Sequence, residues 1–111
     1  MSKNYWLRVE PTLEILVQKY PMAFFPKDSP ETKPLMRGIF TFVTGGNPEI
    51  PRAIIAESLR RYTLKNRYLK ALATHSHRIA LDGAEVESVS EKHRNHAIQI
   101  LLERQSRRIA A

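Results

Sequence analysis

Basic and aromatic side chains alternate in one segment near the middle of the chain, Leu59–Lys70, which reads LRRYTLKNRYLK. Arginine and lysine bind phosphate oxygens and tyrosine rings stack on unpaired bases, so this mixture is typical of proteins that hold single-stranded nucleic acid. Tyr62 falls on the apolar side of the expected helix, which favours a core position. Tyr68 lies on another face beside Arg67, where core packing and ligand contact are equally consistent with the spacing.

The net charge of +7 is concentrated in the same part of the sequence. Residues 33–79 contain nine basic side chains and two acidic ones, whereas the segments before and after are each balanced. Basic side chains that meet phosphates release condensed counterions, so this cluster favours a nucleic acid as the partner. A solvated, solubilising face is the alternative explanation.

No enzymatic chemistry is indicated. Gly45-Gly46 lacks the spacing and the lysine of a phosphate-binding loop, and the acidic residues are too dispersed for a paired-carboxylate site. We therefore expect no catalytic residue, no cofactor and no small-molecule substrate. The absence of cysteine fits a reducing cytoplasm, and no apolar stretch is long enough to cross a membrane.

Four histidines form two local pairs, His75 with His77 and His93 with His96. Four imidazoles could bind Zn²⁺, but their spacing matches no structural site that lacks cysteine, and nothing brings the pairs together. We predict no metal site. The first pair is expected to flank the basic site, and the second to cap or line the last helix.

The scaffold that positions these side chains is predicted to be mostly helical from its hydrophobic periodicity. Gly45-Gly46 is expected to end the second helix, and Ser90 to cap the last one. In the third helix Arg52, Arg60 and Arg67 recur at helical spacing and share one face, interrupted only by small residues. The expected helices are Pro11–Tyr20, one that begins at Pro34 with Leu35, Ile39 and Phe42 or Val43 buried, Arg52–Lys70, and one from Glu91.

A β-hairpin is predicted before the last helix. Asp82-Gly83 lies between two alternating runs, which favours a two-residue type I′ turn. That register places Arg78 opposite Glu87 and Ile79 opposite Val86, with the two apolar side chains facing the core. A cross-strand ion pair could occupy Arg78, but exposed pairs are weak and would leave it able to bind phosphate.

Five sequence blocks occur in an order typical of one known family. They are Lys19–Phe24 (KYPMAF), Lys33–Phe40 (KPLMRGIF), Leu59–Leu69 (LRRYTLKNRYL), Arg78–Gly83 (RIALDG) and Glu91–Ala97 (EKHRNHA). Together the blocks resemble the FinO/ProQ family of bacterial RNA chaperones.

The resemblance implies a mostly α (α+β) domain of about four to five helices with a small β-hairpin over residues 12–105. Residues 1–11 would form an N-terminal extension and residues 106–111 a basic C-terminal tail. It also implies a cytoplasmic RNA chaperone that acts in post-transcriptional regulation. The expected partner is a terminator hairpin with a single-stranded, U-rich 3′ tail, in small RNAs and mRNAs. The oligomeric state stays open, with a monomer favoured.

Carried over position by position, Tyr68 and Arg78 match the pocket that this family uses for the 3′-terminal nucleotides. Arg52, Arg60 and Arg67 match residues that contact the RNA backbone. The complete expected RNA-binding set is Lys33, Arg37, Arg52, Arg60, Thr63, Lys65, Arg67, Tyr68, Lys70 and Arg78.

Three positions depart from the family pattern. Met36 stands where a lysine is frequent, with Arg37 beside it, and Ala80 replaces an expected acid. Pro51 stands where a serine-type helix cap is expected. Proline offers no side-chain acceptor, but the free N–H groups of a helix N-terminus can still bind phosphate. We therefore expect hairpin binding to persist with altered strength.

Two functions of other classes remain as alternatives. A DNA-binding transcriptional regulator would place the Arg52–Lys70 helix in a major groove and would bind duplex DNA more tightly than RNA hairpins. A protein-interaction adaptor would use the basic surface for an acidic partner and would show no salt-sensitive RNA binding.

Overall fold

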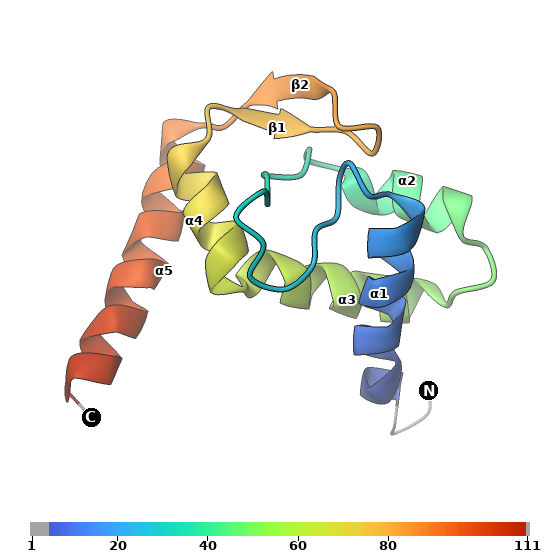
Figure 1. Cartoon of the computed structure of the whole chain (residues 1–111), viewed down its shortest axis with the longest axis horizontal. Helices are drawn as coiled ribbons and strands as arrows, with labels where there is room; N and C mark the ends of the chain where they lie inside the picture. The colour runs from blue at the N-terminus through green and yellow to red at the C-terminus, as the bar shows by residue number, and fades with distance from the viewer. Residues whose placement is uncertain (1–4, 111) are drawn as a thin grey trace.

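The chain forms five α-helices, a 3-10 helix and a two-stranded sheet over residues 5–110, the part that the computed structural model describes (Figure 1). This confirms the expectation of a mostly α (α+β) fold with a small β-hairpin. None of the helices in this described part is long and apolar enough to cross a membrane. In chain order the elements are η1 (Tyr5–Arg8), α1 (Val9–Lys19), α2 (Ile39–Gly46), α3 (Arg52–Leu64), α4 (Asn66–Thr74), β1 (His77–Ile79), β2 (Glu85–Ser88) and α5 (Glu91–Ala110).

The core lies between α1, α3 and the segment that joins α1 to α2. Phe24 is fully buried, with its ring 5.2 Å from that of Tyr62, which in turn lies 5.6 Å from Tyr68. Leu16 and Ile55 are fully buried beside them. Each such side chain contributes roughly 1.5–3 kcal/mol by leaving water. The predicted core position of Tyr62 is confirmed.

Helix α1 begins at Val9, two residues before the expected start at Pro11. The first N–H groups of a helix have no intrahelical partner, so a proline in the first turn costs no hydrogen bond. Val9 is fully buried and belongs to the core. The segment predicted as an N-terminal extension therefore supplies a core residue.

Helix α2 begins at Ile39, and the expected start at Pro34 is wrong. Instead, the segment before it runs parallel to β1: the N–H of Met36 donates to Ile79 O, and the N–H of Ile79 donates to Pro34 O, both at 2.8 Å. Gly38 then adopts a φ of +82°, a left-handed conformation that glycine allows and that marks the turn into α2.

The burial of side chains in α2 decides between Phe42 and Val43, the two core positions that the sequence left open. Val43 is fully buried, whereas Phe42 is 56% exposed. Ile39 is also buried, and it lies one helical turn before Val43 on the same face.

The predicted helix over Arg52–Lys70 is two helices, because Lys65 has extended backbone angles (φ −70°, ψ 147°) between α3 and α4. The sequence has no glycine or proline at this break. The tertiary structure stabilises it: Arg104 of α5 donates to Leu64 O at 2.8 Å and to Asn66 Oδ1 at 2.6 Å. The break lets Leu69 reach the interior, where it is buried.

The hairpin has a different turn and register from those expected. Arg78 lies opposite Glu87 as predicted, but Ile79 pairs with Glu85 because a bulge interrupts the ladder. Val86 consequently points outward and is 49% exposed, which overturns its predicted core position. Ile79 is buried as expected.

The turn contains three residues, 81–83. The N–H of Gly83 donates to Ala80 O and the N–H of Ala80 donates to Ala84 O, each at 2.9 Å. Within this turn only Gly83 has a positive φ, +87°, whereas a type I′ turn needs a positive φ at Asp82 too. The Asp82 carboxylate instead accepts a hydrogen bond from the N–H of Ala84 at 3.0 Å.

Helix α5 begins at Glu91, and the predicted cap is confirmed by a 3.1 Å hydrogen bond from the N–H of His93 to Ser90 Oγ. The helix runs beside α4 and its C-terminal end points away from the other elements (Figure 1). Its apolar face is only partly covered, since Ala97 is fully buried but Leu102 is 57% exposed.

Candidate nucleic-acid interface

Arg78 is a buried cation that has no acidic partner among residues 5–110. Its side chain enters between β1, the segment before α2 and the start of α5, and the residue is only 7% exposed. One terminal nitrogen donates to Leu35 O and the other to His93 Nδ1, both at 3.0 Å. Its Nε is buried and has no hydrogen-bond partner among the described residues. Burying a charge is costly unless it is paired, so this guanidinium is suited to an anion.

The ion pair that the predicted register allowed between Arg78 and Glu87 is not formed in the described part of the chain, although the two residues lie opposite each other in the ladder. Glu87 instead accepts a 2.6 Å hydrogen bond from the backbone N–H of Arg37. This contact joins β2 to the segment before α2. The arginine is therefore not neutralised by the hairpin.

Tyr68 lies beside Arg78, as the pocket assignment requires, but it is a core residue. It is 4% exposed, and its hydroxyl oxygen accepts a 2.9 Å hydrogen bond from the N–H of Leu35. Burial raises the pKa of Tyr68, opposed by the Leu35 N–H and the nearby Arg78 charge, so the hydroxyl stays protonated. Leu35 thus binds both side chains, Tyr68 through its N–H and Arg78 through its carbonyl.

The ring of Tyr68 is unavailable for stacking in this conformation because it packs edge-on against Tyr62. The hydroxyl end is the part that lies toward Arg78. Of the two roles that the spacing left open for Tyr68, core packing is the one that the structure shows.

The start of α5 adds further basic groups beside Arg78. Lys92, His93 and His96 border an open hollow of about 520 Å³ on this helix. Partial burial, followed by the charges of Arg78 and Arg37, lowers the pKa of His93 below its ordinary value. The RNA-binding set expected from the sequence did not include these three residues. The sequence feature that could have identified them is the Glu91–Ala97 block, which contains all three residues and resembles the last helix of the family.

Two of the predicted backbone-binding arginines share the outer face of α3. Arg52 and Arg60 are both exposed and lie eight residues apart, close to two full turns. Arg52 lies over the ring of Phe40, 5.4 Å from its centroid. Thr63 follows on the same helix and donates its hydroxyl to Arg60 O at 3.2 Å.

Glu57 is an acid in the middle of this arginine face. Arg60 donates to both carboxylate oxygens, at 3.0 and 2.7 Å, and Arg61 donates to one of them at 2.9 Å. These bonds hold the pKa of Glu57 at about 2. Arg61 was absent from the RNA-binding set expected from the sequence, and neutralisation of this face by Glu57 was not expected either. Because exposed pairs are weak, a phosphate can compete with Glu57 for them.

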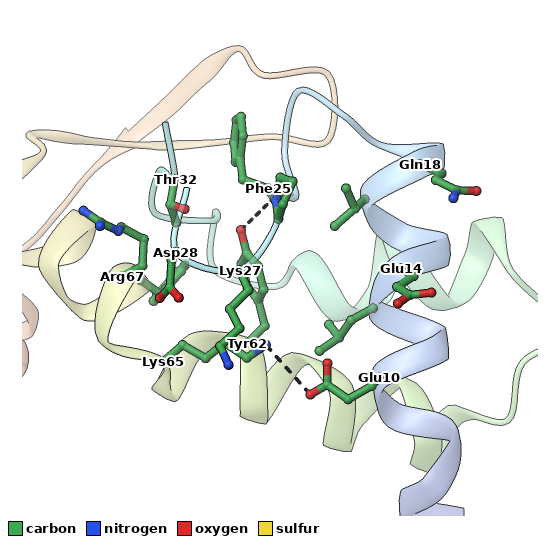
Figure 2. A pocket seen from close by; sticks show the side chains of 14 residues that line it. Glu10, Glu14, Gln18, Phe25, Lys27, Asp28, Thr32, Tyr62, Lys65 and Arg67 are labelled. Carbon is green, nitrogen blue, oxygen red and sulfur yellow. Dashed lines mark hydrogen bonds and ion pairs between the residues drawn. The ribbon is translucent and has the colours of Figure 1, made fainter. Parts of the chain in front are cut away.

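Lys65 and Arg67 lie elsewhere, at a cavity of about 390 Å³ between α1, the loop before α2 and the α3–α4 junction (Figure 2). Lys65 Nζ is 3.8 Å from Glu10 Oε1, and Asp28 lines the same cavity as Arg67. The predicted single face of three arginines is therefore wrong, because the break at Lys65 moves Arg67 away from α3. The charged residues of this cavity are Glu10, Glu14, Lys27, Asp28, Lys65 and Arg67.

Lys33, Arg37 and Lys70 are exposed. The first two flank the Pro34–Met36 segment that carries Leu35, so they lie on either side of the Arg78 contact along the chain. Lys70 is on α4. Within residues 5–110, no three His, Cys, Asp or Glu side chains are grouped in a way that could hold a metal ion.

Comparison with known proteins identifies the family to which this fold belongs. The model of the ProQ/FINO family matches residues 7–111, almost the whole chain. This chain belongs to the ProQ/FINO family. The family resemblance carried by the sequence blocks is therefore confirmed.

Curated relatives match over most of this chain. The RNA chaperone ProQ of Shewanella frigidimarina is 34% identical over 98 residues, which cover 86% of this chain and 47% of that protein. The RNA chaperone ProQ of Aeromonas salmonicida is 34% identical over 99 residues, with 86% and 46% covered. The chain thus spans about half the length of the curated relatives that it matches.

Two solved structures of this family share the fold. A FinO-like RNA chaperone from Neisseria meningitidis has a TM-score of 0.68 at 27% identity, with 82% of this chain and 90% of that chain covered. A ProQ homolog from Legionella pneumophila has a TM-score of 0.70 at 26% identity, with 95% and 87% covered.

Proposed function

We propose that this ProQ/FINO domain is a non-enzymatic RNA-binding module that acts as an RNA chaperone. Its relatives are named RNA chaperones, and its own residues offer the chemistry that this requires. The observation that carries the proposal is Arg78, a buried guanidinium held in place by Leu35 and His93, whose Nε has no partner among the described residues.

The target is an RNA hairpin with a single-stranded, U-rich 3′ tail. Arg78 binds a phosphate near the 3′ end, because a fixed, desolvated guanidinium forms strong charge-assisted hydrogen bonds. Tyr68 supports this contact through Leu35 and presents its hydroxyl rather than its ring. Lys33 and Arg37 bind neighbouring phosphates from either side of the same segment.

The duplex stem contacts the outer face of α3. Arg52 is the first residue of that helix, where free N–H groups add to its charge, and Arg60 follows two turns later. Thr63 and Arg61 extend this face. Since an A-form duplex offers little base readout to proteins, recognition is by shape and sequence specificity is low.

The remaining members of the predicted set are outer contacts. Lys65, Arg67 and Lys70 are on or next to α4, where the first two line a cavity that also carries acidic residues, so they steer RNA by charge more than they position it. We propose that residues 12–105 hold the RNA-binding part of the domain, that the segment before them contributes the core residue Val9, and that residues 106–111 form a basic tail. We also propose a cytoplasmic, monomeric protein that regulates small RNAs and mRNAs after transcription.

Affinity for three matched nucleic acids tests the function. We expect a hairpin with a 3′ U-tail to bind about tenfold or more tightly than the same hairpin with its tail at the 5′ end, since only the first presents a single-stranded 3′ end. If about five phosphates are neutralised, log K falls with log salt at a slope of about −3 to −5. Fluorescence anisotropy over a salt series measures both quantities.

Three outcomes would contradict the proposal. Equal affinity for the two tail positions would remove 3′-end recognition. Tighter binding to duplex DNA than to either hairpin would favour the transcriptional regulator, whose single Arg52–Lys70 helix the structure does not contain. RNA binding that is absent, or insensitive to salt, would favour the protein adaptor.

A further inference from the structure

His93 accepts a hydrogen bond from a residue that has only donors. A terminal nitrogen of Arg78 lies 3.0 Å from His93 Nδ1. A guanidinium carries no acceptor, so this contact requires an unprotonated Nδ1 and a neutral imidazole whose proton is on Nε2. Protonation of Nδ1 would turn the hydrogen bond into a contact between two cations.

The surroundings of His93 also favour its neutral form in the free protein. Partial burial is the largest cause of its lowered pKa, and the nearby positive charges add to it. Glu87 of β2 is engaged by the backbone of Arg37. The basic groups that act on His93 are Arg78 of β1, Arg37 of the segment before α2, and Lys92 and His96 of α5.

We propose that His93 is a proton-linked residue of the RNA site. In the free protein its imidazole occupies an acceptor position on Arg78. When RNA binds, a phosphate oxygen takes that position, and His93 binds a proton and donates to the same phosphate. This inference rests on the proposed function, because it needs an RNA phosphate at Arg78.

The exchange follows from the relative strengths of the acceptors. A charged phosphate oxygen forms a stronger hydrogen bond with a guanidinium than a neutral nitrogen does. Once the phosphate is present, its negative charge offsets the cations around His93 and raises the pKa of the imidazole. The complex therefore holds a proton that the free protein lacks.

The sign of the pH dependence follows from this proton uptake. The affinity for RNA is constant at pH values above the pKa of His93 in the complex, and it rises as the pH falls through that value. The rise ends below the pKa of His93 in the free protein. RNA phosphodiesters do not titrate in this range, so the change comes from the protein.

The test compares binding of one hairpin with a U-tail and no terminal phosphate at about pH 8 and about pH 6, at constant ionic strength. Wild-type affinity for this hairpin should be about three- to tenfold higher at the lower pH than at the higher pH. In His93→Gln, whose amide oxygen can still accept from Arg78, the rise should fall below about twofold. His77→Gln is the matched control. The sequence predicted that His77 flanks the basic site, but successive strand side chains point to opposite faces, so His77 points away from Arg78 and lies 3.8 Å from Glu85. That variant should keep the wild-type rise.

The failures of the two proposals are distinct. Wild-type RNA binding with no rise, or the same rise in His93→Gln, would overturn the inference and leave RNA binding intact. No RNA binding at either pH would overturn the proposed function. NMR titration of the His93 imidazole in the wild-type protein needs no variant: a higher pKa with RNA supports the exchange, and an equal or lower one refutes it.

Discussion

Two groups of basic residues in this protein differ in what surrounds them. Around Arg78, the partners are a carbonyl and a neutral imidazole, and the nearest hairpin acid is engaged by a backbone N–H. Around Lys65 and Arg67, the cavity carries equal numbers of acidic and basic side chains (Figure 2). Both groups belong to the same basic stretch of sequence. Clustered charge therefore predicts an anion partner, but only the arrangement of acids shows which cations are available to it.

The largest expected effect is that of Arg78→Ala, compared with Arg67→Ala in the other group. Arg78→Ala should weaken binding to the U-tailed hairpin about 10- to 100-fold, the range for a lost hydrogen-bonded charge of about 1.5–3 kcal/mol. Arg67→Ala should cost less than about threefold, because the cavity that it lines also carries acidic side chains that offset its charge. Anisotropy titrations at one salt concentration measure both variants.

Arg78→Lys is the matched variant for this comparison. It keeps the charge but loses the planar fork, so its affinity should lie between those of Arg78→Ala and the wild type. Thermal unfolding identifies a loss that comes from the fold. Equal effects of Arg67→Ala and Arg78→Ala would erase the distinction between the two groups.

The two buried tyrosines extend the comparison to stability. Tyr68→Phe leaves the buried N–H of Leu35 without its acceptor, which should lower the free energy of unfolding by about 1–3 kcal/mol. Tyr62→Phe removes a longer, part-buried bond from the N–H of Phe25 and should cost about 0.5–1.5 kcal/mol. Urea unfolding measures both losses in free energy of unfolding. A larger loss for Tyr62→Phe than for Tyr68→Phe would contradict the expectation that the hydrogen bond beside Arg78 contributes more to stability.

The smallest expected effect is a gain. Glu57→Gln removes the carboxylate that binds Arg60 and Arg61, so affinity for the hairpin should rise about two- to threefold at low salt and less at high salt. Glu49→Gln is a suitable control, since it removes one acid from the same basic segment of the chain without releasing these arginines. A gain of equal size from both variants would mean that net charge alone sets the affinity.

Local patterns predicted the elements whose signals are short-range. Ser90 caps α5, and Arg78 lies opposite Glu87. These features depend on neighbouring residues or on side-chain alternation, so a single sequence contains the information. The family blocks identified the ProQ/FINO family for a similar reason: each block is a short run of neighbouring residues, and the blocks follow one another in the order typical of the family.

A helical α+β domain with its excess charge in one stretch is already evident from the amino-acid sequence, because periodicity and composition are properties of neighbouring residues. Which of these charges can bind an anion depends on the packing of the elements. The break at Lys65 depends on a bond from Arg104, forty residues after Leu64, and it separates Arg67 from Arg60. The burial of Arg78 depends on Leu35 and His93, which lie far from it in sequence. Long-range contacts of this kind leave no periodic signal, because they depend on how separate elements pack.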